Sequence, residues 1–253
     1  MSPALRLRGL TKRFGSTLAV DRLDLDVPRG SFYGLVGPNG AGKTTTLSMA
    51  TGLLRPDGGT AEVLGHDVWT DPVAAKTRVG VLPDGLRLFD RLTGRQLVTY
   101  AGLLRGLDRD VVAHRVDELL AALGLTEACD KLVIDYSAGM TKKVTLACAL
   151  VHAPRLLVLD EPFEAVDPVS ARTIRGILEG FVASGGTVVL SSHVMDLVER
   201  ICTDVAVIAQ GSVRAAGPLA EVRGPGSLED RFLELVGAPA DVEGLAWLRT
   251  SSD

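Results

Sequence analysis

The segment with the clearest chemical character runs from Gly37 to Thr45 and reads Gly-Pro-Asn-Gly-Ala-Gly-Lys-Thr-Thr. Residues 37–44 fit the pattern G-x-x-x-x-G-K-[ST] of a phosphate-binding loop. Glycines let the backbone curl so that several N–H groups point at one anion, and the positive end of a following helix favours negative charge at the same place. We therefore expect this loop to bind the phosphates of a nucleotide.

The elements on both sides of the loop support this interpretation. Residues 31–36 are mostly apolar and predict a short buried strand, and residues 43–53 predict a helix. The alternative, a glycine turn that carries a lysine by chance, does not explain this strand-loop-helix order. The side chain of Lys43 can reach the β- and γ-phosphates, and the Thr44 hydroxyl can hold Mg²⁺. The predicted nucleotide contacts here are Gly37, Pro38, Asn39, Gly40, Ala41, Gly42, Lys43, Thr44 and Thr45.

A second group of reactive side chains follows a fully apolar run at residues 156–159, which predicts a strand buried on both faces. Asp160 and Glu161 come directly after it, at the end of a strand where α/β sheets bind their ligands. We expect Asp160 to hold Mg²⁺ and Glu161 to polarise the attacking water as a general base. The alternative is an acidic pair in a surface turn.

A third candidate, His193, follows an apolar strand at residues 187–190 and two serines. A neutral imidazole at this place is suited to contact a γ-phosphate and a water molecule. The alternative is a loop histidine without function. The other histidines, His66, His114 and His152, have no comparable setting and receive no role.

Alternating strands and helices position these residues and predict an α/β fold with a parallel sheet. Further strands are expected near residues 5–7, 23–27, 60–64 and 79–82, and a hairpin at 205–216. Between them, residues 93–150 predict an inserted helical subdomain whose first helix opens with a capping box, Thr93 to Gln96. We divide the chain into a nucleotide-binding domain, residues 1–217, and a tail, residues 218–253, which has a short amphipathic helix and frays near residues 250–253.

Composition excludes several classes of protein. The chain has 253 residues and a net charge of −4, which gives no support to non-specific nucleic-acid binding. No apolar run reaches the roughly 18 residues that span a bilayer. The three cysteines are widely spaced and contain no Cys-x-x-Cys pair, so we expect no zinc site and a reducing, cytosolic compartment.

The order of these motifs resembles that of the ATP-binding subunit of ABC transporters over about residues 5–217. The resemblance implies a P-loop NTPase core with a mixed, mostly parallel central sheet, an N-terminal antiparallel β portion and the inserted helices. Phe14 matches the aromatic residue that stacks on adenine, with a core phenylalanine at a strand end as the alternative. Residues 164–168 are similar to the family's D-loop, and His193 falls at its switch histidine.

Two positions depart from the family pattern. The signature is usually Leu-Ser-Gly-Gly-Gln and here reads Tyr-Ser-Ala-Gly-Met at residues 136–140, which keeps Ser137 and Gly139 for contact with a γ-phosphate. Asp84 stands where the family usually has a glutamine that touches Mg²⁺. An aspartate can still coordinate the metal, or it can change how hydrolysis and transport are coupled. Such variants resemble the drug- and lipid-export branch, of the ABC-2 type.

The resemblance implies a motor subunit that hydrolyses ATP with Mg²⁺, with Glu161, His193 and Lys43 as its catalytic residues. Two copies, or one copy and a similar subunit, would enclose ATP between the loop of one and Ser137 and Gly139 of the other. The opening and closing of the two copies would be passed to an integral-membrane permease on a separate chain. This subunit would lie on the inner face of the membrane, and no nucleic-acid partner is expected. The alternatives are a soluble ABC-type ATPase that acts on ribosomes or DNA, and a small-molecule kinase.

Overall fold

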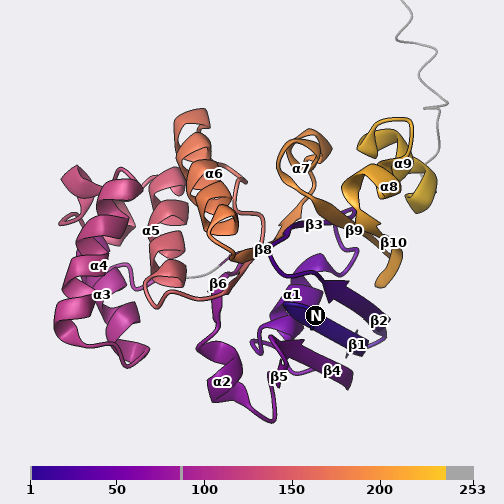
Figure 1. Ribbon diagram of the computed structural model, residues 1–253, viewed down its shortest axis with the longest axis horizontal. Helices are drawn as coiled ribbons and strands as arrows, with labels where there is room; N and C mark the ends of the chain where they lie inside the picture. Colours follow the sequence, from indigo (N-terminus) through magenta and orange to yellow (C-terminus); the bar gives the residue numbers. More distant parts are fainter. Residues whose placement is uncertain (1, 86–87, 238–253) are drawn as a thin grey trace, which may run out of the picture.

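The computed structural model describes residues 2–85 and 88–237, and their strands form two sheets (Figure 1). The predicted fraying at residues 250–253 lies outside this range. A 4-stranded antiparallel sheet has the order β2-β1-β4-β5, and a 6-stranded sheet has the order β10-β9-β3-β8-β7-β6. The strands are β1 (Leu5–Phe14), β2 (Thr17–Val27), β3 (Phe32–Val36), β4 (Gly58–Val63), β5 (His66–Asp67), β6 (Val79–Leu82), β7 (Leu156–Leu159), β8 (Thr187–Ser192), β9 (Asp204–Ala209) and β10 (Ser212–Pro218).

The larger sheet is mostly parallel because only β10 runs against its neighbour. The predicted fold class, a P-loop NTPase core with a mixed sheet and an N-terminal antiparallel portion, is confirmed. The predicted hairpin is the β9–β10 pair. The capping box at Thr93 is also present, with both of its hydrogen bonds.

Both faces of the larger sheet are buried, which accounts for its continuous apolar strands. Along β3, Phe32 and Val36 belong to one core cluster, and Tyr33 and Leu35 belong to the other, as strand alternation requires. The second cluster also contains Leu47 and Met49 of α1 and residues of the antiparallel sheet. Helix α1 (Lys43–Ala50), which follows the phosphate loop, is therefore fixed between the two sheets.

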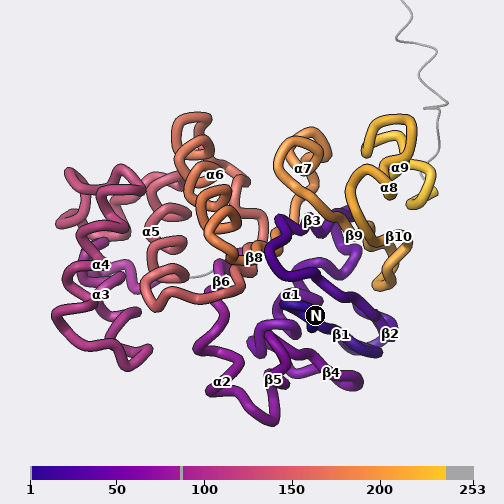
Figure 2. The backbone as a smooth tube through the Cα atoms, in the orientation of Figure 1, coloured from indigo at the N-terminus to yellow at the C-terminus, as the bar shows by residue number. Residues whose placement is uncertain are grey.

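Helices from the inserted region and from the C-terminal end lie at opposite ends of the molecule in Figure 2. α3, α4 and α5 gather at one end beside α6, and α8 and α9 lie at the other end near β10. The remaining helices are α2 (Pro72–Lys76), α3 (Gly94–Leu104), α4 (Arg109–Ala122), α5 (Ala138–Leu150), α6 (Pro168–Ala183), α7 (Met195–Ile201), α8 (Leu219–Arg223) and α9 (Leu228–Val236), with 3₁₀ turns at Thr126–Ala128 and Val133–Asp135. The domain boundary at residue 217 stays a prediction.

Several boundaries differ from those predicted. The helix expected over residues 43–53 ends at Ala50, because Gly52 takes a left-handed conformation (φ 72°) and the chain turns there. The strand expected at residues 60–64 begins two residues earlier, since Gly58 pairs with Thr11. The strand expected at residues 187–190 continues to Ser192, so Ser191 is a buried strand residue.

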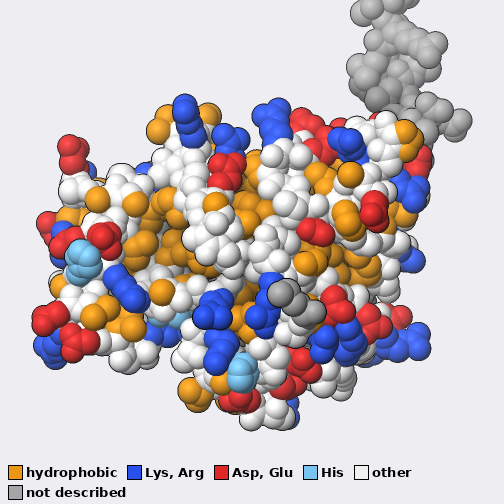
Figure 3. Space-filling view, in the orientation of Figure 1, with side chains coloured by type: hydrophobic (Ala, Val, Ile, Leu, Met, Phe, Trp, Pro, Cys, Tyr) orange, Lys and Arg blue, Asp and Glu red, His pale blue; other side chains and the backbone are white. Residues whose placement is uncertain are grey.

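Charged side chains of both signs are interspersed over the face shown in Figure 3, with apolar side chains between them. Within residues 2–85 and 88–237, no helix is long and apolar enough to cross a membrane. The carboxyl ends of the parallel strands lie at the same edge of the sheet. There β3 leads into the phosphate loop, β7 into Asp160 and Glu161, and β8 into His193. This convergence places residues from three distant segments at one site.

Candidate nucleotide site

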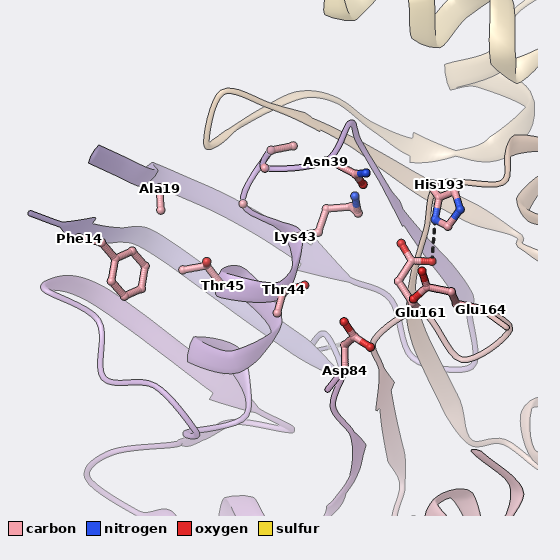
Figure 4. A pocket seen from close by; sticks show the side chains of 13 residues that line it. Phe14, Ala19, Asn39, Lys43, Thr44, Thr45, Asp84, Glu161, Glu164 and His193 are labelled. Atoms are coloured by element: carbon pink, nitrogen blue, oxygen red, sulfur yellow. Dashed lines mark hydrogen bonds and ion pairs between the residues drawn. The ribbon is translucent and has the colours of Figure 1, made fainter. Parts of the chain in front are cut away.

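A pocket of about 430 Å³ lies at this edge of the sheet and contains most of the predicted site residues. Figure 4 shows Phe14 at one end, Glu161 and His193 at the other, and Lys43 between them. An elongated ligand with an aromatic end and an anionic end matches this arrangement. The lining residues are Phe14, Ala19, Asn39, Gly40, Ala41, Gly42, Lys43, Thr44, Thr45, Asp84, Glu161, Glu164 and His193.

Two glycines of the phosphate loop are required by close backbone contacts. At Gly37, an added Cβ would overlap the Ile208 carbonyl of β9. At Gly42, φ is 103° and an added Cβ would lie 2.5 Å from the Ala19 carbonyl oxygen. Both contacts are made with main-chain atoms that have little freedom to move, so a side chain at either position would displace the loop.

The turn of the β9–β10 hairpin also holds the loop in place. The Gly211 N–H donates to the Ala41 carbonyl at 3.0 Å, and the Asp21 N–H of β2 donates to the Gly211 carbonyl at 3.0 Å. The sequence predicts no role in the site for this turn. It had no local signal, because the loop and the hairpin are about 170 residues apart in sequence.

The start of α1 is left open for an anion. Gly42 is the N-cap residue and has no side chain, and no side-chain hydrogen bond caps this helix within the described part of the chain. The first N–H groups of a helix have no partner inside the helix, so here they are directed to the pocket. The local structure thus offers both the hydrogen-bond donors and the positive helix end that phosphate groups require.

Lys43 is held inside the loop. Its Nζ donates to the Gly37 carbonyl at 2.7 Å and lies 3.3 Å from the Pro38 carbonyl, and the residue is only 7% exposed. Burial lowers the pKa of this amine, and the charges of Glu161 and Asp160 oppose that shift. An anion in the pocket would stabilise the ammonium form further, because an opposite charge nearby favours the charged state.

Asp160 and Glu161 are joined through Ser191 on the neighbouring strand. The Ser191 hydroxyl donates to the buried Asp160 carboxylate, and the Glu161 N–H donates to the same hydroxyl at 2.9 Å. This serine fixes the position of both acidic residues relative to β8. In the sequence, Ser191 stands out only as a neighbour of His193. Its contact with both acidic residues depends on the β7–β8 pairing, which sequence spacing alone does not show.

Glu161 and His193 form a pair at one end of the pocket. His193 Nδ1 lies 3.1 Å from Glu161 Oε2, which is a hydrogen bond between the two side chains (Figure 4). Glu161 is the more buried partner, with a side chain 14% exposed against 49% for His193. Glu164 lines the same pocket, although the sequence predicts no catalytic or binding role for it. The arrangement places a carboxylate and an imidazole where they can share one water molecule.

The three predicted Mg²⁺ ligands occupy different positions around α1. Thr44 and Asp84 line the pocket. Asp160 is 3% exposed and lines a separate small hollow between α1 and the ends of β6 and β7. Within residues 2–85 and 88–237, no three His, Cys, Asp or Glu side chains are grouped to hold a metal by themselves. This donor set still suits Mg²⁺, which usually takes one or two carboxylates and completes its shell with water and substrate phosphates.

Ser137 and Gly139 do not reach the pocket of their own chain. Ser137 caps α5 and accepts a hydrogen bond from the Met140 N–H at 3.3 Å. Gly139 is buried against the start of α6, where an added Cβ would lie 2.9 Å from Asp167 Oδ2 and from Ser170 Oγ. Both residues therefore lie at a helix N-terminus that is separate from the phosphate loop.

The phosphate loop, the acidic strand end and the histidine on one α/β sheet define a P-loop nucleoside triphosphatase. The family model described as ABC transporter matches residues 20–164, which is more than half of the chain. The chain belongs to the ABC transporter family and is one of its ATP-binding, ATP-hydrolysing units.

Similar curated proteins and solved structures agree with this membership. The daunorubicin/doxorubicin resistance ATP-binding protein DrrA of Streptomyces peucetius is 40% identical over 220 residues, which cover 87% of this chain and 67% of that protein. The Nod factor export ATP-binding protein I of Ralstonia nicotianae is 38% identical over 216 residues, covering 85% and 67%. A solved ATP-binding subunit of an ABC transporter superposes with a TM-score of 0.85 at 27% identity, covering 92% of this chain and 99% of that one.

Proposed function

We propose that this chain is the motor subunit of an ABC exporter and drives transport by hydrolysing ATP. The main support is that one pocket combines a phosphate loop with the Glu161–His193 pair. The phosphate loop would bind the nucleotide, and the Glu161–His193 pair would provide a base that accepts a proton from the attacking water. Two similar proteins are named for drug resistance and for Nod factor export, which supports the export direction.

In the proposed reaction, Phe14 stacks on the adenine ring, and Lys43 with the first N–H groups of α1 holds the phosphates. Glu161 accepts the proton of the attacking water, and His193 keeps that carboxylate oriented through the 3.1 Å contact. Thr44, Asp160 and Asp84 would hold Mg²⁺, which when bound neutralises charge on the phosphates. The half-buried position of Glu161 limits competition from bulk water.

A second copy of this chain, or a similar subunit, completes each site in this proposal. Ser137 and Gly139 lie at the N-terminus of α5, where N–H groups and the helix dipole favour an anion. Because they lie outside their own pocket, they are suited to contact the ATP bound by a partner. ATP would then hold the two copies together, and hydrolysis would release them.

We place the contact with an integral-membrane permease at the start of the helical insertion, near residues 84–93. Phe89 and Tyr100 are exposed there, at 61% and 43%, and their rings meet edge to face with centroids 5.6 Å apart. With Asp90, Arg91 and Leu92 they line an apolar hollow of about 350 Å³. Exposed apolar surface of this kind is typical of a protein contact. The proposed location is cytoplasmic, on the inner face of the membrane, without a nucleic-acid partner.

Affinity capture from detergent-solubilised membranes tests this assignment. We expect the tagged full-length chain to recover a multi-spanning membrane protein. The variant Phe89→Asp should recover much less of it, because a charge in the apolar hollow opposes its burial. Its ATP affinity should stay unchanged. Recovery of ribosomal or DNA-bound material, equal for both variants, would instead favour a soluble ATPase of the same fold.

A further inference from the structure

Lys142 connects two parts of the site that come from distant segments. It lies in the second turn of α5, and its Nζ donates to the carbonyl oxygen of Glu161 at 2.9 Å. The same Nζ lies 3.9 Å from Asp84 Oδ1. The Lys142 side chain is only 18% exposed, so its ammonium group is directed inward, between the ends of β6 and β7.

The contact with Glu161 bears on the geometry of the proposed base. Glu161 has a φ of 46°, a left-handed conformation that is unfavourable for a residue with a side chain. Such a conformation persists only where surrounding contacts enforce it. Here Ser191 binds the N–H of Glu161, while Lys142 and the Glu164 N–H, at 3.2 Å, bind its carbonyl. Lys142 is the one charged side chain among these contacts.

The contact with Asp84 gives the lysine a second partner. Asp84 carries a negative charge, and the Lys142 ammonium group 3.9 Å from its Oδ1 balances that charge. The Asp84 side chain is 45% exposed, so the pair contributes little to stability, as exposed ion pairs do. Its effect is on orientation, because the ammonium group draws the Asp84 carboxylate towards the carbonyl of the base.

Helix α5 also carries Ser137 and Gly139 at its start. A helix moves as a rigid element, so a displacement of its N-terminus also displaces Lys142, which lies one turn further along. The residue that supports the base of one site is thus on the same helix as the residues proposed to meet ATP in the other site.

We propose that Lys142 is a positioning residue for hydrolysis, which holds the Glu161 main chain and the Asp84 carboxylate in a geometry set by α5. This inference depends on the proposed role of Glu161 as the base. Lys142 itself does not line the nucleotide pocket, so its effect is on the rate of hydrolysis and not on nucleotide affinity.

The test compares Lys142→Met, Lys142→Gln and Lys142→Arg in the purified full-length chain, with ATP and Mg²⁺. We expect Lys142→Met and Lys142→Gln to lower kcat by about 10- to 100-fold, because small errors in placing a reacting group have effects of this size. KM for ATP should change by less than about threefold, because the residues that bind ATP are unchanged. Lys142→Arg keeps a charged donor and should restore most of kcat.

Lys143→Met is the matched control, because it removes the same charge one position further along α5 and has no contact with Glu161 or Asp84 among the described hydrogen bonds and ion pairs. It should leave kcat unchanged. Unchanged kcat in Lys142→Met, an equal loss in Lys143→Met, or a rise in KM alone would overturn the inference. If Glu161→Gln hydrolyses ATP normally, the proposed function itself fails; if only Lys142→Met is normal, the positioning role alone fails.

Discussion

Glu161→Gln is expected to lower ATP hydrolysis by about a hundred- to ten-thousand-fold, the usual contribution of a general base. Glutamine keeps the shape and the hydrogen bond to His193 but cannot accept a proton from water. The phosphate loop is unchanged, so the affinity for ATP should be kept. Because ATP then stays intact, a dimer stabilised by ATP should accumulate. Phosphate release and size-exclusion chromatography with ATP measure these two effects.

Glu164→Gln is the matched control for this prediction. Glu164 lines the same pocket but has no hydrogen bond to His193 among the described contacts, whereas Glu161 Oε2 does at 3.1 Å. Its substitution should therefore reduce hydrolysis far less than Glu161→Gln does. Normal turnover in Glu161→Gln, or a larger loss in Glu164→Gln, would remove Glu161 from the role of base.

Lys43→Ala is the second substitution with a large expected effect. It removes a buried ammonium group that faces the proposed phosphate position, and hydrogen bonds to charged groups contribute roughly 1.5–3 kcal/mol. The Kd for ATP should rise by about 10- to 100-fold, and hydrolysis should fall at least as much. The carbonyls of Gly37 and Pro38 lose their donor at the same time, which can also loosen the loop.

A fluorescent ATP analogue measures this affinity, and thermal unfolding shows whether the variant is folded. Lys131→Ala is the control, because Lys131 is exposed on the helical insertion and lies outside the nucleotide pocket. It should bind ATP as the unmodified chain does. Equal ATP affinity in Lys43→Ala and Lys131→Ala would show that the loop does not bind the nucleotide in the expected way.

Much of the fold was predictable because its signals are local. The phosphate loop is a contiguous motif, the apolar run at residues 156–159 has the length of a buried strand, and Thr93 begins a helix with a complete capping box. Each depends on residues within one short segment. The class of sheet followed from the alternation of such segments along the chain.

Other features depend on contacts between distant segments and could not be predicted. Ser191 acts on Asp160 and Glu161 only because β8 lies beside β7, and Gly211 supports the loop only because β9 lies beside β3. Lys142 on α5 contacts the carbonyl of Glu161 after β7, and the spacing of the two residues in the sequence does not predict this contact. The left-handed backbone at Glu161 has no sequence signal either, since glutamate does not favour it.

A composite site, shared between two subunits, is the central claim, and mixing two inactive variants tests it most directly. Lys43→Ala lacks the ammonium group proposed to contact the phosphates. Ser137→Glu places a negative charge at the helix end proposed to meet the partner's ATP. If each site is shared between two copies, both defects fall in one site of a mixed dimer and the other site is intact.

Hydrolysis is then measured for each variant alone and for an equal mixture. We expect almost no activity from either variant and recovery to about a quarter of the unmodified rate in the mixture, because half of randomly paired dimers are mixed and each has one of two sites intact. Full activity of Ser137→Glu alone, or no recovery on mixing, would contradict the shared site.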